Sequence, residues 1–258
     1  MFCASANAAM HPLIMNSTAA SKRVGQMESI SSAVWGAQTR ALMWPLYERK
    51  RQNNKSAALS PALRWALEDF NLHLDLNTHR HLYSLAVPRP CYVACSDARG
   101  AVGGIYGSEH LGGAILPRKG ESSKFFPALM HAPVSHYSKW LPPARQEDSI
   151  KQRINECESL AALVTLATFA ELLTSSDILW VIDSSAAEGT LRKGYSSSRF
   201  LTALAGEFWR LASSRNIRIW LYRVPSKLNL ADPISRVELN AFTSWSVREA
   251  AELDPSNF

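Results

Sequence analysis

The sequence contains little that would place it in a membrane, in an oxidising compartment or among disordered chains. No apolar stretch approaches the ~18 residues that indicate a membrane span. The four cysteines form no CxxC pair and no zinc-type spacing with the seven histidines, which favours buried or free thiols in a reducing compartment. Charged residues make up only 19% of the chain and hydrophobic residues 47%, which excludes a highly charged disordered polypeptide. We therefore expect a folded intracellular protein, of the cytoplasm or nucleus, with no membrane partner.

The sequence is also short of acids. Its formal net charge of +6 suggests an anionic partner, although many basic proteins bind none. Between Arg192 and Lys227 eight basic residues stand against one acid, Glu207. This bias suits contacts with a phosphate backbone, and a solvated helix face is the alternative. We expect Arg192, Lys193 and Lys227 to contact nucleic acid, with Tyr195 as a stacking partner.

The first part of the chain predicts helices. No convincing periodicity precedes Glu28, the first acid. Pro45 is expected to end or kink a helix over residues 29–50, and Ser60 to cap an amphipathic helix over residues 61–74. The predicted divisions are a disordered or leader-like segment, a helical segment, an α/β domain and a C-terminal helix or tail, at residues 1–28, 29–88, 89–238 and 239–258.

The pattern changes beyond Pro88. Strands are expected at residues 92–97, 101–106, within 111–140, at 178–182 and at 217–224. Helices are expected at residues 154–174, 185–192 and 197–214, and from Asn229 onward. The first two strands flank the turn Arg99-Gly100 and should form a hairpin. This order predicts an α/β domain with a mixed sheet, whose core includes Trp180, Trp209 and Trp220.

Four acids lie where elements of this domain begin or end. Asp183 directly follows the apolar run ILWVI, and Asp97 likewise ends a strand. Glu158 lies in the first turns of the long apolar helix, and Asp232 lies just past the last strand. Because functional side chains gather where strands of α/β sheets end, the four can meet at one point. Each also has a local explanation: a turn residue for Asp97, an N-cap for Asp183, an arginine's partner for Glu158, and the start of a turn before Pro233 for Asp232.

Carboxylates that meet in this way need a cation or a proton. At ~4 Å, two unit charges repel by about 4 kcal/mol with an effective dielectric constant of 20. Ligand sets made only of oxygen select hard ions such as Mg²⁺. Two such ions, ~3.5–4 Å apart, can activate a water and stabilise a leaving oxygen. The four acids therefore favour phosphoryl chemistry.

Four sequence blocks carry a family resemblance. In chain order they are YVACSDARGAVGGIYG, INECESLAAL, WVIDSSAAEGTLRKG and VPSKLNLADPISR. They resemble, in the same order, the blocks of ribonuclease H domains attached to retroelement reverse transcriptases. The closest likeness is to tyrosine-recombinase-type retrotransposons, which have an S-D-A-S-G strand, an I-N-x-x-E-x-x-A helix, a V-x-x-D-N-x-x-A strand end and an N-x-x-A-D-x-x-S-R finish. The resemblance covers residues 91–236.

The resemblance implies a ribonuclease H-like fold, a mixed sheet flanked by helices, after a small helical N-terminal segment. It implies that Asp97, Glu158, Asp183 and Asp232 are catalytic acids that hold two Mg²⁺ ions, with Mn²⁺ as a substitute, and that the RNA strand of an RNA–DNA hybrid is cleaved. Asp97 and Asp183 would coordinate centrally, Glu158 would position one ion, and Asp232 the other. Asn229 would support them by orienting the last helix. The rest of a retroelement polyprotein is a second expected partner.

The sequence departs from the family pattern at several places. Arg99 occupies the usual serine position of the first block, and Ser184 replaces the asparagine after the third acid. The histidine that many cellular ribonucleases H carry before the fourth acid is absent from VPSKLNLAD. Residues 109–149 are expected to be a long insertion.

Two function classes remain open. Residues 35–44 and SPALRWALEDF resemble the region that joins polymerase to ribonuclease H, but the chain contains no Tyr-x-Asp-Asp polymerase motif. The leading hypothesis is a hybrid-cleaving ribonuclease, and Arg99 and the insertion motivate the alternative of an inactive nucleic-acid-binding or scaffold module. A 3′–5′ exonuclease would need an Asp-x-Glu pair on the first strand, and an integrase would need a glutamate in place of Asp232. Both are disfavoured.

Overall fold

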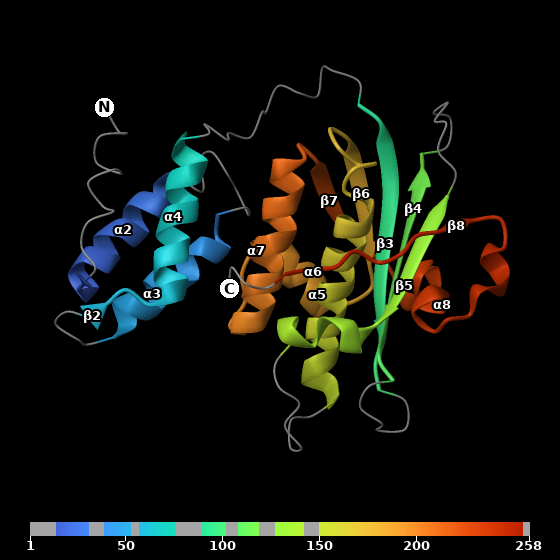
Figure 1. Cartoon of the computed structure of the whole chain (residues 1–258), viewed down its shortest axis with the longest axis horizontal. Helices are drawn as coiled ribbons and strands as arrows, with labels where there is room; N and C mark the ends of the chain where they lie inside the picture. Colours follow the sequence, from blue (N-terminus) through green and yellow to red (C-terminus); the bar gives the residue numbers. More distant parts are fainter. Residues whose placement is uncertain are drawn as a thin grey trace. The chain divides into compact units, whose positions relative to one another are not determined.

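The chain divides into two units, residues 1–85 with 256–258, and residues 86–255. Figure 1 shows their elements in this computed structural model. The structure describes residues 14–30, 39–52, 57–75, 89–101, 108–118, 127–141 and 150–254. Among these, no helix has the length and apolarity needed to cross a bilayer.

The first unit is mainly helical. Its helices are α2 (Ser17–Ile30), η2 (Ala41–Met43), α3 (Trp44–Arg51) and α4 (Pro61–Asp75), and its strands β1 (Ile14–Met15) and β2 (Ala57–Ala58) pair antiparallel. Val24, Leu46 and Leu63 share one apolar core. Ser60 Oγ accepts a hydrogen bond from the backbone N–H of Leu63 at 3.2 Å, so the predicted cap of α4 is confirmed.

Two features of this unit differ from expectation. Most of α2 lies within residues 1–28, where no periodic element was expected, and its residues Ala20, Val24 and Met27 recur at helical spacing and are buried. Pro45 is the second residue of α3 instead of ending a helix, because the first turn of a helix does not need the missing proline N–H. Residues 31–38, and the predicted boundary at Pro88, lie outside the described residues.

The second unit is built on a six-stranded mixed sheet of order β7-β6-β3-β4-β5-β8. The strands are β3 (Cys91–Arg99), β4 (His110–Pro117), β5 (Ala128–Pro133), β6 (Asp177–Ile182), β7 (Arg218–Arg223) and β8 (Ser246–Val247). Strands β3, β4 and β5 are antiparallel neighbours, β6 and β7 run parallel to β3, and β8 runs parallel to β5.

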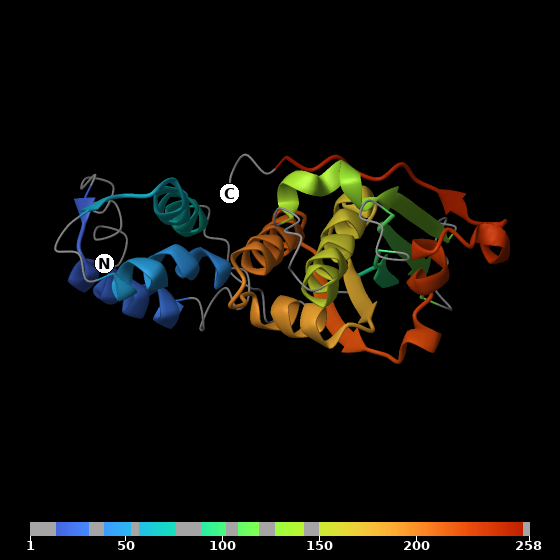
Figure 2. The same ribbon diagram turned by 90° about the horizontal axis from the view of Figure 1, so that it is seen from below.

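Helices cover both faces of this sheet. They are η5 (Val134–Trp140), α5 (Ile150–Phe169), α6 (Ser185–Lys193), α7 (Arg199–Ser214), η6 (Ser226–Leu228), α8 (Ala231–Ser235) and η7 (Leu239–Phe242). Figure 2 shows α5 and α7 on one side of the sheet and α8 on the other. The predicted architecture, an α/β domain with a mixed sheet flanked by helices, is confirmed.

The strand that pairs with β3 is not the predicted one. Strand β4 fills this place, whereas most of the expected strand, at residues 101–106, lies outside the described residues. The supposed insertion at residues 109–149 in fact holds β4, β5 and η5. The pair Gly112-Gly113 weakened the strand signal, and both glycines are needed here because helices lie too close for a side chain. A Cβ would be 2.4 Å from Ser235 N at Gly112 and 1.9 Å from Thr165 Oγ1 at Gly113.

The C-terminal segment, residues 239–258, is more than a helix or tail. It adds β8 to the sheet beside β5. Tyr137 Oη then donates a hydrogen bond to Ala251 O at 2.8 Å, and Ala251 N donates to Thr168 Oγ1 at 3.0 Å. The segment is therefore fastened to η5 and α5.

Candidate metal centre

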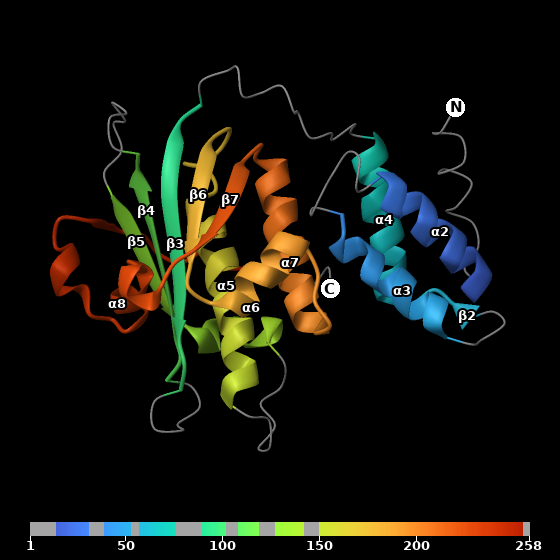
Figure 3. The same cartoon turned by 180° about the vertical axis from the view of Figure 1, so that it is seen from behind.

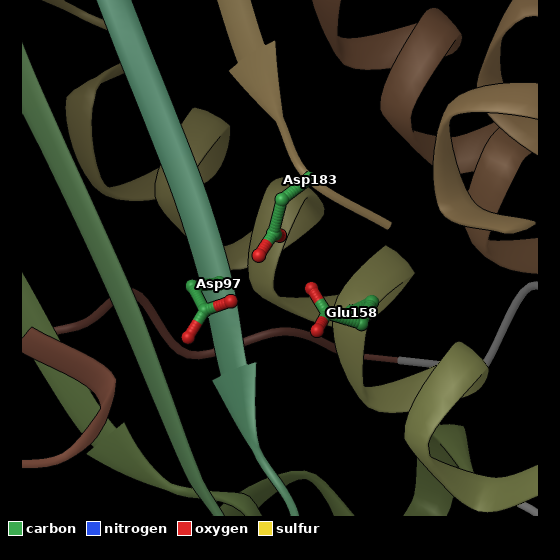
Figure 4. Close-up of side chains that lie close together, drawn as sticks. All are labelled: Asp97, Glu158 and Asp183. Atoms are coloured by element: carbon green, nitrogen blue, oxygen red, sulfur yellow. The ribbon is translucent and has the colours of Figure 1, made fainter. Parts of the chain in front are cut away.

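Three carboxylates meet beside the central strand of the second unit. Asp97, Glu158 and Asp183 each present one oxygen, and these oxygens all lie within 4.8 Å of one another. The three acids come from β3, α5 and the end of β6 and point toward a common centre (Figure 4). Asp97 and Glu158 are buried, and Asp183 is partly buried. Acids that are 61 and 25 positions apart in sequence thus share one small volume.

Asp97 is fixed by both the sheet and α8. It lies within β3 opposite Gly112, so it is not a turn residue. Its Oδ2 accepts a hydrogen bond from Ser235 Oγ at 2.5 Å. The missing side chain at Gly112 lets α8 approach closely enough for this bond.

Asp183 is held by the loop that follows β7. Asn229, which is buried, donates from Nδ2 to Asp183 Oδ1 and to Ser96 O, each at 3.1 Å, and accepts from Ala231 N at 3.2 Å. Asp183 is not the N-cap of α6, because Ser184 Oγ accepts the bond from Ala187 N. The asparagine therefore ties the ends of β3 and β6 to the start of α8.

Glu158 enters the cluster from the third turn of α5. Its carboxylate accepts a hydrogen bond from the backbone N–H of Ala98, and its Oε2 is buried with no hydrogen-bond partner. Glu156, two residues earlier, points elsewhere and accepts a bond from Ser198 Oγ at 3.3 Å. Only one of the two neighbouring acids therefore faces the cluster, as helix geometry predicts.

Asp232 does not join the group of three. Its side chain is 30% exposed, and its Oδ1 pairs with Arg236 at 2.9 Å. Its negative charge still acts on the cluster, where it contributes to the raised pKa of Asp97 and of Glu158. Asp232 thus lies at the margin of the site.

Burial and crowding favour protons on two of these acids. Burial is the largest cause that raises the pKa of Asp97 to about 6, and the charges of Asp183 and Asp232 add to it, against the Ser235 hydrogen bond. Burial also raises the pKa of Glu158 to about 9, with further increases from Asp97 and Asp183. At neutral pH Glu158 therefore keeps its proton while Asp97 is mostly ionised, and a cation that binds between these acids would displace the Glu158 proton.

The predicted substrate contacts lie on the surface, outside the cluster. Lys193 and Lys227 are exposed, and the Tyr195 side chain is 46% exposed. The Arg192 guanidinium is engaged within the fold, by Glu188 Oε1 at 2.6 Å and Leu221 O at 3.2 Å. Their contact with nucleic acid stays a prediction.

Sequence reasoning missed Ser235. It stands three positions after Asp232, in the S-R pair that ends the last block, so the signal was present in the motif. A helix of period 3.6 places residues i and i+3 on one side, and in α8 it is the hydroxyl of Ser235 that reaches Asp97 of β3.

No family model matches the sequence, and the comparison with curated proteins found no match. Solved structures do match. The N-terminal ribonuclease H domain of a Mycobacterium tuberculosis protein, fused to maltose-binding protein, is 17% identical with a TM-score of 0.42, over 59% of this chain and 95% of that one. Ribonuclease H1 of Halobacterium salinarum is 15% identical with a TM-score of 0.40, and the match covers 56% of this chain and 93% of that one. The protease–reverse transcriptase of prototype foamy virus is 11% identical with a TM-score of 0.34, and the match covers 62% of this chain and 22% of that one. Such identities establish no activity for this chain.

Proposed function

We propose that the second unit is a Mg²⁺-dependent ribonuclease H-type endonuclease that cleaves the RNA strand of RNA–DNA hybrids. The observation that carries this proposal is the meeting of Asp97, Glu158 and Asp183, whose ligand oxygens lie within 4.8 Å of one another. Sites that hydrolyse phosphodiesters with two metal ions are built from such acids.

The residues present fit a hard divalent cation. All the candidate donors are carboxylate oxygens, which Mg²⁺ and Mn²⁺ accept. Glu158 Oε2 is buried and has no hydrogen-bond partner, so one ligand position is unsatisfied without a cation. Asp97, Glu158 and Asp183 would hold the ions, with Asp232 at the exposed margin.

Two bound ions would supply an activated water and stabilise the leaving oxygen. The protein's part is to fix the ligands before the substrate arrives. Ser235 holds Asp97 through Oδ2, and Asn229 holds Asp183 through Oδ1. Because these bonds come from one short segment, residues 229–235, the position of this segment decides the geometry of both acids.

The substrate is inferred from charge and from the family resemblance. The basic bias between residues 192 and 227 suits contacts with phosphates, and the affinity for a hybrid should fall steeply with salt. The four sequence blocks favour descent from a retroelement reverse transcriptase, in which the first unit would be the connection to the polymerase. On this reading the partners are the hybrid and the rest of a polyprotein.

The substitution Asp183→Asn tests the proposal. It removes a ligand charge and keeps the shape, so Mg²⁺-dependent cleavage of a labelled hybrid should fall at least about a hundredfold. In EDTA the variant should melt no lower than the parent, because it removes repulsion and because Ser184, not Asp183, caps α6. Glu171→Gln, an exposed acid of the same unit, is the matched control. Full cleavage by Asp183→Asn, or a large drop in its melting temperature, would refute the assignment.

The alternative is an inactive module that binds nucleic acid with the same fold. The observation that favours it is the place of Asp232, which pairs with Arg236 outside the group of three. Salt-sensitive hybrid binding, with no cleavage by the parent protein in Mg²⁺ or Mn²⁺, would select this alternative.

A further inference from the structure

One face of the second unit carries apolar side chains that the fold does not bury. Leu179 of β6 and Trp220 and Tyr222 of β7 are 40%, 45% and 60% exposed. The register pairs Leu179 with Trp220, and Val181 with Tyr222, so these side chains share one face of the sheet. We call Trp220 and Tyr222, together with the adjacent aliphatic Leu179, the aromatic strip. The prediction that Trp220 belongs to the core is wrong.

The exposure follows from the layout of the sheet. Strand β7 is the outermost strand at its end of the sheet (Figure 3), and α6 and α7 pack against it. The helix on the other face, α8, contacts β3, β4 and β5 instead. Exposed apolar groups that gather on one face commonly mark an interaction site.

The charge around the strip indicates the kind of partner. Residues 215–227, RNIRIWLYRVPSK, contain four basic residues and no acid. Arg218 lies two positions before Trp220, and its guanidinium carbon is 5.8 Å from the centroid of that ring. Its carboxylate partner is Asp177, on β6. Aromatic rings beside basic groups favour an anionic partner with flat faces over an apolar peptide.

We propose that the aromatic strip binds single-stranded nucleic acid that continues from the hybrid. Trp220 and Tyr222 are two positions apart along a strand, about 7 Å, which allows successive bases to stack on the two rings. The strip also leads to the metal centre: Arg223, the next residue after Tyr222, pairs with Ile182, which directly precedes Asp183. The inference deepens the proposed function and rests on it for the substrate.

Binding of tailed and blunt hybrids tests the proposal. The full chain in EDTA is titrated onto a labelled blunt hybrid of roughly 12 base pairs and onto the same hybrid with a single-stranded tail of roughly 8 nucleotides. The parent should bind the tailed hybrid at least about tenfold more tightly. The double substitution Trp220→Leu/Tyr222→Leu, which keeps apolar area without rings, should lose this preference, and Trp220→Phe/Tyr222→Phe should keep most of it.

The outcomes separate the alternatives. Equal affinity of the parent for the two hybrids, or a tail preference that the leucine pair retains, would overturn the proposal. A parent dimer in sedimentation that the leucine pair abolishes, with no tail preference, would show that a second copy of this chain covers the strip. Cleavage of the blunt hybrid in Mg²⁺ is measured separately, so loss of the proposed nuclease function and loss of tail binding can be told apart.

Discussion

At the scale of single residues, the ionisation of Glu158 makes the stability of the fold depend on pH. Burial raises its pKa from the model-compound range to about 9, so between about pH 4.5 and 9 the folded state keeps a proton that the unfolded state releases. Stability without metal must therefore be greatest at the acidic end of this range and fall as pH rises. The slope is at most about 1.4 kcal/mol per pH unit for one proton. Asp97, with its pKa raised to about 6, adds to the slope only at the acidic end.

The check is the melting temperature in EDTA from pH 5 to 9, for the parent and for Glu158→Gln. The variant cannot ionise at this position, so its advantage over the parent should grow with pH and level off near pH 9. Parallel curves for the two proteins would show that Glu158 ionises normally. Added Mg²⁺ should raise the parent's melting temperature most at high pH, because a cation need not displace a proton there.

Substitution of Asn229 should affect cleavage indirectly, because Asn229 acts through Asp183. Asn229→Ala removes the hydrogen bonds to Asp183 Oδ1 and Ser96 O, so cleavage should fall about 10- to 100-fold and more Mg²⁺ should be needed for half-maximal activity. The buried carbonyl left without its partner should also cost about 1–3 kcal/mol. Ser226→Ala, exposed in the same loop, is the control. A loss of stability with no change in Mg²⁺ dependence would make Asn229 a structural residue only.

At the scale of elements, the pair Gly112-Gly113 brings two helices to the sheet. Gly112→Ala would place a Cβ 2.4 Å from Ser235 N, so α8 must move and carry Ser235 away from Asp97. We expect a loss of about 1–3 kcal/mol in unfolding free energy together with lower cleavage. Gly189→Ala, in α6 with nothing within 4 Å of the new Cβ, should stabilise by roughly 0.5–1 kcal/mol. Chemical denaturation of the two variants measures both effects.

The same glycines explain what the sequence could and could not predict. Long apolar segments such as α5 and β6 were predicted near their observed bounds, because a run of apolar residues depends on burial alone. Only one strand, without bounds, was expected within residues 111–140, where the structure has β4 and β5, because the role of the glycines depends on helices that approach from distant parts of the chain. For the site, the convergence of Asp97, Glu158 and Asp183 was predicted from strand ends and motif order. The pairing of Asp232 with Arg236 and the bond from Ser235 depend on side-chain placement, which no spacing shows.

At the scale of the whole molecule, the division into two units predicts that the second unit folds without the first. The cluster of Asp97, Glu158 and Asp183 and the six-stranded sheet lie entirely within residues 86–255. A polypeptide of these residues should therefore unfold in one transition and keep the Mg²⁺-dependent cleavage of the full chain within about threefold. Calorimetry and the hybrid assay check the two parts. A fragment that folds only when residues 1–85 are supplied would contradict this division.

The late position of β8 in the chain has a consequence for biosynthesis. This two-residue strand lies beside β5, and it is synthesised after the other five strands of the sheet. Until then one edge of β5 presents unpaired backbone N–H and C=O groups, and such an edge can pair with another polypeptide. A premature stop codon between Phe242 and Ser246 would make that state permanent, so its product should accumulate as aggregates while retaining Asp97, Glu158 and Asp183.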